Sequence, residues 1–235
     1  LADNYAIQLT KNAGQNNENP IISNDAKQIY FESNRTNSRH IWRIDMDGNN
    51  PTQITFSEKE NEFFPALSND GEWLYFLKKS PQGNVILKQN LKDKRIENIT
   101  KQGEFSPNTF ICPSPDGKWL AFNNIKETRG GENEKTSEIG IVHLEEQNKV
   151  SIYRFPRIGG SFSWTTDSKS FDYYENSGEG GKLWRRNLDE SAEPQLLLTV
   201  PKMAIFNFAW SKDGNNLALA IGKQERDVIL LRNFE

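Results

Sequence analysis

One sequence motif recurs five times at nearly even intervals, and it constrains the fold more than any other feature of the chain. Each copy has an apolar or aromatic pair, then Ser or Thr, any residue and Asp, and then an apolar and aromatic run. The spacings between the aspartates are 45, 46, 51 and 46 residues, and the aspartates are Asp25, Asp70, Asp116, Asp167 and Asp213. A repeat of about 40–50 residues that carries several short strands is typical of the blades of a β-propeller.

Every copy continues with a second alternating run and then a short run, which in most copies ends on threonine. Strand-length runs of β-branched and aromatic residues between Asp-Gly turns indicate hairpins, and no window of helical length has a 3.6-residue period. We therefore predict an all-β fold, a β-propeller of four-stranded antiparallel blades with strands a to d in each. The predicted single domain spans residues 1–235, and its five blades cover residues 19–55, 63–100, 109–153, 160–199 and 205–234.

The ends of the chain do not coincide with the boundaries of the repeat. The fifth copy stops after its third strand, and residues 5–10 have the pattern of an isolated strand d. Pairing of residues 5–10 with residues 228–232 would complete the last blade and close the ring, which removes exposed strand edges that favour aggregation. The alternative is that the chain was cut from a longer propeller, so that residues 5–10 belong to a missing blade.

Composition argues against several classes of function. The formal charge is -3 and there is no basic run, so we expect no nucleic-acid binding, because phosphate contacts need clustered lysine and arginine. No stretch approaches the ~18 consecutive apolar residues of a membrane span, and we expect no membrane insertion. Cys112 is the only cysteine, and the chain has two histidines. These residues are fewer than the four ligands usual for a zinc site built from Cys and His alone. We predict no metal and no cofactor.

The repeat resembles that of a known family. Residues 114–122, which read Ser-Pro-Asp-Gly-Lys-Trp-Leu-Ala-Phe, match the repeat of TolB-type propellers, which are relatives of WD-repeat proteins. Residues 33–35 and 41–48 match its later part, and the resemblance covers nearly the whole chain. Residues 205–214 and 226–234 look like the end of the C-terminal propeller domain of modular bacterial regulators, in which a DNA-binding or kinase domain precedes the propeller.

No constellation of residues points to catalysis. Propeller peptidases pair the fold with a hydrolase domain, and here the sequence closest to a Gly-x-Ser-x-Gly elbow is residues 159–163, at the start of a strand a. Oligogalacturonate lyase, an enzyme that resembles this family, places several metal-binding histidines in its channel. This chain has His40 and His143 in different blades. We interpret both as structural or exposed side chains rather than as ligands or bases.

Three further motifs have structural interpretations. The five repeated aspartates lie in the turns between strands a and b, where a carboxylate can accept backbone N–H bonds. Residues 45–50 partly imitate a calcium loop but lack its further oxygen ligands, so we expect a hairpin turn. Gly130 and Gly131 lie in a polar b–c loop, residues 123–137, without the lysine of a phosphate-binding loop. This loop is the first place to look for a contact specific to a partner.

A binding face is expected where the d–a and b–c loops meet, at the end conventionally called the top of a propeller. Arginine and aromatic side chains are common anchors of interfaces, and eight of them fall on or near these loops. The candidate residues for binding a ligand or partner are Arg35, Arg39, Phe64, Phe110, Arg129, Arg157, Phe162 and Phe206. Alternatively, the phenylalanines pack between blades and the arginines are solvated surface.

These observations predict a non-catalytic binding module, a monomeric TolB-like propeller that holds a protein segment or a small molecule at its top face or channel. The resemblance implies the sensor or scaffold part of a larger bacterial protein, in the periplasm or another extracytoplasmic compartment. Two alternatives stay open. One is an enzyme, either a polysaccharide lyase or hydrolase with a channel active site or the propeller domain of a peptidase. The other is a domain that only positions its neighbours.

Overall fold

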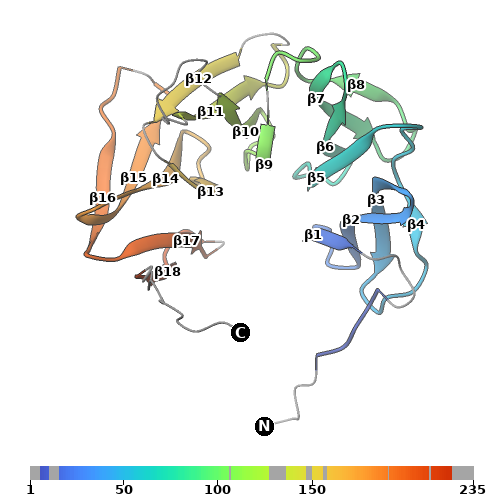
Figure 1. The fold of residues 1–235 in the computed structure, drawn as a ribbon, viewed down its shortest axis with the longest axis horizontal. Coiled ribbons are helices and arrows are strands. Elements are labelled where there is room, and N and C mark those ends of the chain that lie inside the picture. Colours follow the sequence, from blue (N-terminus) through green and yellow to red (C-terminus); the bar gives the residue numbers. More distant parts are fainter. Residues whose placement is uncertain are drawn as a thin grey trace, which may run out of the picture. The chain divides into compact units, whose positions relative to one another are not determined.

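A computed structural model describes residues 6–10, 16–105, 107–126, 136–146, 150–155, 158–189, 191–211 and 213–223 (Figure 1). These residues form strands and no helix, and therefore contain no helix that could cross a bilayer. The strands make four antiparallel sheets of four strands and one of two. The predicted all-β fold with four-stranded antiparallel blades is therefore confirmed. The chain divides into two compact units, residues 1–156 and 157–235.

The first unit holds three four-stranded sheets whose strands follow one another in chain order. The first sheet is β1 (Asn17–Ile22), β2 (Gln28–Thr36), β3 (Ser38–Asp45) and β4 (Thr52–Gln53). The second is β5 (Asn61–Leu67), β6 (Trp73–Ser80), β7 (Gly83–Asn90) and β8 (Ile96–Asn98). The third is β9 (Pro107–Pro113), β10 (Trp119–Lys126), β11 (Thr136–His143) and β12 (Val150–Phe155).

The second unit holds one four-stranded sheet and one strand pair. The four strands are β13 (Ile158–Trp164), β14 (Ser170–Ser177), β15 (Gly180–Asn187) and β16 (Gln195–Pro201), and the pair is β17 (Ala204–Trp210) and β18 (Leu217–Gly222). The third strand expected in the last repeat, residues 228–231, lies outside the described residues. The predicted pairing of residues 228–232 with residues 5–10, and with it the count of five closed blades, stays a prediction.

Residues 6–10 correct one expectation, because they are described and form no strand. Leu9 and Thr10 instead line a small cavity of about 200 Å³ over one face of the first sheet, together with Phe31. The Leu9 backbone also lies close to Gly48, so close that a Cβ atom there would be 2.8 Å from the Leu9 carbonyl oxygen. The segment is thus held by side-chain and backbone packing rather than by a hydrogen-bonded ladder.

The repeated motif builds the turn between the first two strands of each sheet. In the first copy the Ser23 hydroxyl donates to Asp25 at 2.7 Å, and the same carboxylate accepts the Lys27 N–H at 3.1 Å. The Ser23 oxygen accepts the Gln28 N–H at 2.9 Å. The same three bonds recur in the other four turns, around Asp70, Asp116, Asp167 and Asp213. The turn role predicted for the aspartates is confirmed.

The second sheet is buried on both faces, because successive side chains of a strand point to opposite sides. Leu74 and Phe76 of β6 pack against the first sheet, whereas Tyr75 and Leu77 pack against the third. In the second unit a smaller core surrounds Tyr174, with side chains from β15, β16, β17 and β18. Face-to-face stacking of the three sheets of the first unit brings their loops together at the ends of the strands.

Candidate functional site

The first strand of every sheet contains an irregularity in its pairing with the second strand. The register shifts lie at residues 18–21 in β1, 63–66 in β5, 107–111 in β9, 158–162 in β13 and 205–207 in β17. At two of these places a residue adopts a left-handed backbone, Asn19 with φ of 50° and Phe64 with φ of 54°. Such a conformation is rare for a bulky side chain, and bulges and backbone strain are frequent at functional sites.

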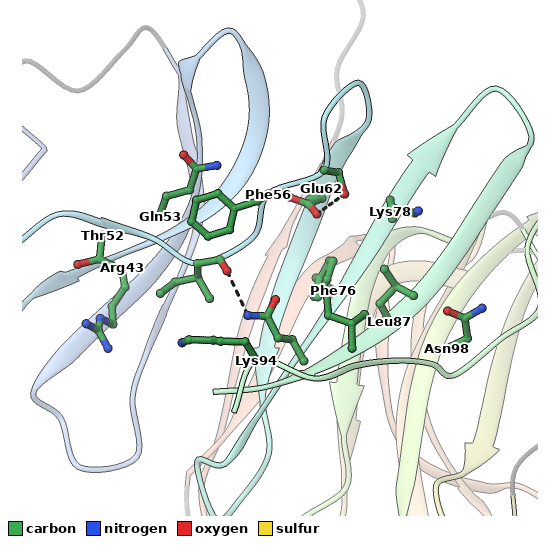
Figure 2. A pocket seen from close by; sticks show the side chains of 14 residues that line it. Arg43, Thr52, Gln53, Phe56, Glu62, Phe76, Lys78, Leu87, Lys94 and Asn98 are labelled. Carbon is green, nitrogen blue, oxygen red and sulfur yellow. Dashed lines mark hydrogen bonds between the residues drawn. The ribbon is translucent and has the colours of Figure 1, made fainter. Parts of the chain in front are cut away.

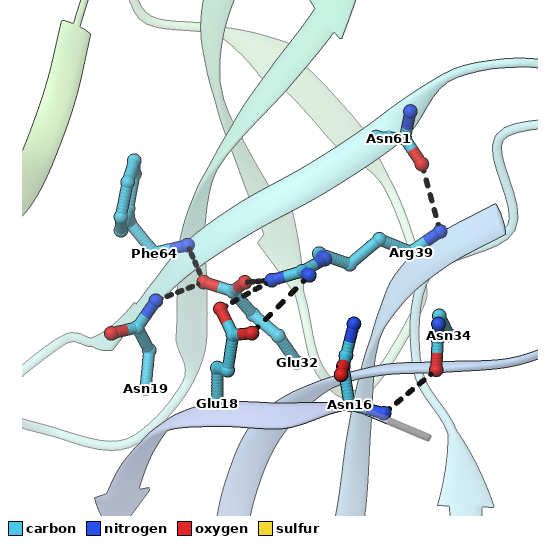
Figure 3. A network of polar contacts seen from close by, with 8 residues as sticks. All are labelled: Asn16, Glu18, Asn19, Glu32, Asn34, Arg39, Asn61 and Phe64. Carbon is cyan, nitrogen blue, oxygen red and sulfur yellow. Dashed lines mark hydrogen bonds and ion pairs between the residues drawn. The ribbon is translucent and has the colours of Figure 1, made fainter. Parts of the chain in front are cut away.

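A buried carboxylate holds both irregular strands. Glu32 on β2 is completely buried, and its Oε1 accepts the Phe64 N–H at 2.7 Å and the Asn19 amide at 2.6 Å (Figure 3). The other oxygen accepts a hydrogen bond from Arg39 Nη1 at 3.0 Å. Because Asn19 belongs to β1 and Phe64 to β5, Glu32 joins the first strands of two neighbouring sheets.

Arg39 connects this carboxylate to the surface. Its Nη1 also donates to Glu18 at 2.6 Å, and its backbone N–H donates to Asn61 at 2.9 Å (Figure 3). The Arg39 side chain is 19% exposed and that of Glu18 is 51% exposed. Hydrogen bonds to Glu18 and then to Glu32 raise the pKa of Arg39, while the bond to Arg39 lowers the pKa of Glu18. The guanidinium therefore stays charged between two carboxylates.

A second buried pair lies beside these residues. His40 follows Arg39 on β3, and its Nδ1 lies 2.7 Å from Oε2 of Glu62 on β5. The Ser57 hydroxyl donates to the other oxygen of Glu62 at 2.7 Å. The side chains of His40 and Glu62 are 7% and 2% exposed. We call the whole group the top cluster, and it comprises Glu18, Asn19, Glu32, Arg39, His40, Asn61, Glu62 and Phe64.

Aromatic rings and a second cation border the top cluster. The rings of Phe63 and Phe64 lie 6.0 Å apart, centroid to centroid. The Arg39 guanidinium lies 5.3 Å and Lys79 Nζ 4.8 Å from the centre of the Phe63 ring. Cations at these distances are attracted to the ring face. The cluster thus combines fixed charge, amide groups and apolar surface, which suits recognition of a polar ligand with an apolar part.

The structure brings two of the predicted site residues together, since Arg39 and Phe64 both bond to Glu32. Arg35 lies elsewhere, with its guanidinium 4.3 Å from the Trp42 ring and 5.3 Å from the Phe31 ring. Phe31 precedes Glu32 on β2 and therefore points to the opposite face of the sheet. Burial lowers the pKa of Arg35. Arg35 is thus separated from the top cluster by the thickness of the first sheet.

The other predicted site residues are scattered over the chain. Phe110 is half-buried in β9, and the Phe162 ring stacks at 5.1 Å on Phe171 of β14, the neighbouring strand in the same sheet. Phe206 is 53% exposed, and its carbonyl accepts the Tyr174 hydroxyl at 2.8 Å. Arg129 and Arg157 lie outside the described residues. Binding by any of the eight stays a prediction.

The remaining motifs have clear local roles. His143 Nδ1 accepts the Glu146 N–H at 3.1 Å, and its ring packs edge-on against Trp119 at 4.5 Å. Gly48 has φ of 85° in the turn between β3 and β4, and Asp47 accepts the Asn49 N–H at 2.9 Å, as expected for a hairpin. Within the described residues, no group of three or more His, Cys, Asp or Glu side chains is placed to hold a metal.

The central residue of the cluster, Glu32, and its neighbours Glu18 and Glu62 are not among the residues that the sequence predicted for binding. A signal for Glu32 was present in the repeat. Alignment of the copies on their aspartates places Glu32 where the others have Leu77, Asn123, Tyr174 and Ala220. A carboxylate at a position that is otherwise uncharged indicates a buried partner, because a buried charge must be paired.

The fold of the chain is similar to that of propeller proteins of known structure. No family model and no curated protein sequence matches the chain. TolB from Acinetobacter baumannii superposes with a TM-score of 0.59 at 20% identity, over 86% of this chain and 48% of that one. A puromycin-hydrolyzing peptidase of Mycobacterium tuberculosis gives 0.64 at 16% identity, over 89% and 36%. Oligogalacturonate lyase from Vibrio parahaemolyticus gives 0.53 at 12% identity, over 87% and 70%.

At these identities the likeness concerns the fold, and this chain spans about half the length of the Acinetobacter TolB. TolB and enzymes share the architecture, so the fold by itself does not decide between binding and catalysis. The five-copy repeat, the four-stranded antiparallel sheets and the match to TolB agree with one another. The chain therefore has the fold of a TolB-type β-propeller.

Proposed function

We propose that the chain is a non-catalytic binding module, the sensor or scaffold part of a larger bacterial protein, which holds a protein segment or a small ligand at its top face. The observation that carries the proposal is the top cluster. Glu32 orders the irregular stretches of β1 and β5 around Arg39 before any ligand arrives. A site that is ordered in advance loses little conformational entropy on binding, which favours affinity.

The charges of the cluster suggest how a ligand would engage it. Glu18 is the exposed partner of Arg39, whereas Glu32 is buried. A ligand carboxylate could displace Glu18 and take its place on the guanidinium, whose fork binds carboxylates through two parallel bonds. Phe63 and Lys79 then offer an apolar and a cationic contact at the border of the site. These features favour a ligand that carries both a carboxylate and an apolar group.

Site-specific photo-crosslinking in bacterial cells tests this proposal. A photoreactive amino acid would replace Lys59, which is exposed in the loop between β4 and β5 beside the top cluster, or Lys118, which is exposed in the turn between β9 and β10 at the opposite end of the sheets. We expect a discrete adduct from position 59 and none from position 118. The Arg39→Ala change should abolish the adduct. Adducts of equal yield from both positions, or one that survives the loss of Arg39, would contradict binding at the top face.

An enzyme is the second candidate, and the His40–Glu62 pair is the observation that favours it. A carboxylate that orients an imidazole is part of many general-base arrangements. Here the Ser57 hydroxyl donates to Glu62, so it supports the carboxylate rather than serving as a nucleophile beside the base. Assays for ester, peptide and polygalacturonate cleavage would decide between the candidates. Turnover that disappears in His40→Gln would favour the enzyme, and we expect none above background.

We also propose that the module is monomeric and works outside the cytoplasm, on the strength of the resemblance to TolB-type propellers. Light scattering of the purified chain measures its mass, and 27.0 kDa is the value for one copy. Fractionation of the source cells locates the full-length protein. Recovery of the protein in the cytosolic fraction would contradict the proposed compartment without affecting the binding proposal.

A further inference from the structure

A second concave surface lies on the flank of the first unit, between its first and second sheets (Figure 2). This flank groove has a volume of about 510 Å³, within the usual range for specific ligand sites. One end of the groove reaches Ser57 and Glu62 of the top region. From there it extends past the chain that follows β4 to Lys94, in the turn between β7 and β8. The groove is therefore long and open along its side.

The floor of the flank groove is apolar, and so is part of its border. Phe76 and Leu87 are buried beneath it as part of the core between the two sheets. Phe56 and Ile96 also line it, and they are 70% and 54% exposed. Exposed large apolar side chains that line one concavity are typical of interaction sites, because a partner that covers them removes apolar surface from water.

The charged side chains that line the groove are mostly cationic. Arg43, Lys78 and Lys94 are the cations, and Glu62 is the one acid in the lining. That acid is already bonded to His40 and Ser57, and Lys78 pairs with Glu60 at 3.0 Å.

Arg43 and Lys94 have no acidic partner in the described part of the chain. Within the described residues, the Nε atom of Arg43 is buried without a hydrogen-bond partner, and Lys94 Nζ donates only to the Leu91 carbonyl, at 2.8 Å. The buried Nε atom is not open to a docked group, but the charges of both side chains remain without a counterion in these residues. The groove therefore complements a negatively charged group.

Strand edges border the groove on both sides. β4 is the last strand of the first sheet and β8 the last of the second. Within the described residues no further strand pairs with either. Edge strands offer backbone N–H and C=O groups to an extended segment of another chain. A groove with two such borders fits an extended peptide better than a helix.

From these observations we infer that the flank groove binds an extended acidic peptide segment that carries an apolar anchor residue. The anchor lies over Phe76 and Leu87 and covers Phe56, and acidic side chains on either side of it pair with Arg43 and Lys94. The groove shares Glu62 with the top cluster, but the proposed peptide contacts use Phe56, Arg43 and Lys94 and do not use Arg39 or Glu32. The peptide proposed for the flank groove and the ligand proposed for the top cluster can therefore be tested independently.

Fluorescence anisotropy with a labelled eight-residue peptide tests the inference on the full chain. The probe has glutamates around a central Leu-Phe pair, one twin replaces the glutamates by lysine, and a second replaces Leu-Phe by Gly-Gly. We expect the acidic probe to bind, with an affinity that falls as salt rises, and both twins to bind at least tenfold more weakly. Equal binding of the lysine twin would overturn the inference, and so would no binding of the acidic probe.

Two exposed substitutions and two matched controls locate the site. Phe56→Ser and Lys94→Glu each should weaken probe binding about tenfold, which corresponds to about 1.4 kcal/mol. Phe206→Ser and Lys118→Glu make the same changes at exposed positions outside the groove and should have no effect. If controls and groove variants lose affinity equally, binding is not in the groove. If N-acetylphenylalanine binds as tightly as the probe, the groove takes small carboxylates and the peptide assignment is wrong.

Discussion

Glu32 is the residue on which the candidate site depends, and its burial is the reason. A carboxylate without exposed surface must be compensated by hydrogen bonds and an opposite charge, and Glu32 receives bonds from Asn19, Phe64 and Arg39. Its removal would leave the partly buried guanidinium of Arg39 and the partly buried N–H of Phe64 with fewer partners. At the residue scale, one side chain thus determines the order of two irregular strands.

We expect Glu32→Ala to lower the free energy of unfolding by on the order of 2–4 kcal/mol, because Asn19, Arg39 and the Phe64 N–H each lose a hydrogen bond to a completely buried carboxylate. Glu18→Ala is the matched control. Glu18 bonds to the same arginine, but its side chain is half exposed and the loss should be much smaller. Urea denaturation of the two variants measures the difference, and equal losses would contradict the central role of Glu32.

Gly140 is the basis of a second prediction about a single residue, which concerns the packing of the core. It lies opposite Phe122 in the pairing of β10 with β11, and a Cβ atom there would come within 2.2 Å of the Phe122 ring. Phe122 is fully buried, so the ring cannot move without disturbing the core. Gly140→Ala should cost about 1–3 kcal/mol of stability by overpacking.

The control for Gly140 is Gly178, in the turn between β14 and β15, where a Cβ atom would meet nothing within 4 Å. Gly178→Ala should leave the melting temperature of the protein nearly unchanged. If the Gly140→Ala variant has the same melting temperature as the parent protein, Phe122 has room to shift and the prediction is wrong.

At the scale of elements, asparagine side chains join the turns of successive sheets. Asn24 lies in the turn before β2, and its amide donates to the carbonyls of Ser68 at 3.1 Å and Asn69 at 2.6 Å, in the turn before β6. The Asn69 amide in turn donates to the Pro115 carbonyl, in the turn before β10. Pro115 has no side-chain amide and therefore cannot donate a further hydrogen bond of this kind. These links supplement the apolar packing between the sheets of the first unit.

Asn69→Ala removes one of these links, and we expect a loss of roughly 0.5–1.5 kcal/mol, the usual net value of a hydrogen bond. Asn49→Ala is the control, because in the described part of the chain the Asn49 side-chain amide bonds only to Asp47 of its own turn and its loss should matter less. Hydrogen exchange adds a local measurement. The amides of β9 and β10 should exchange faster in Asn69→Ala but not in Asn49→Ala, and unchanged exchange would contradict the link.

At the scale of the whole molecule, the repeated turns make stability depend on pH. The pKa values of Asp25, Asp70, Asp167 and Asp213 are lowered, first by the hydrogen bond from the Ser or Thr hydroxyl and then by a backbone N–H. A carboxylate with a lower pKa in the folded state stabilises the fold above its unfolded pKa of about 3.9. That contribution is lost as the pH falls through the folded pKa.

We therefore expect stability to decline as the pH falls below about 4 towards the lowered pKa values of the folded state, with a contribution from turns in both units of the chain. Asp70→Asn should make the decline shallower, because the amide does not titrate. Urea denaturation at half-unit pH steps gives the slope for each protein. A slope that is the same with and without Asp70 would show that the turns do not carry the effect.

Contacts between residues close together in the sequence were predictable, whereas contacts between residues far apart in the sequence were not. The turns were predictable because their partners lie two to five residues apart, as in the bonds among Ser23, Asp25 and Gln28. The strands were predictable because alternation of apolar residues is also local. Residues 5–10 show the limit of local pattern, since they have a strand-like sequence, but the described residues 6–10 lie in no ladder.

The four-stranded repeat and the role of its aspartates could be predicted from the sequence, because both follow from contacts between near neighbours. The meeting of Arg39 and Phe64 and the position of the flank groove became evident only in the folded chain. Two of the partners of Glu32 are separated from it by 13 and 32 residues, Asn19 in the first sheet and Phe64 in the second. The first contact exists only after β1 has paired with β2, and the second only after one sheet has stacked on the next. The side chains that form a site are therefore chosen by pairing and packing rather than by local pattern.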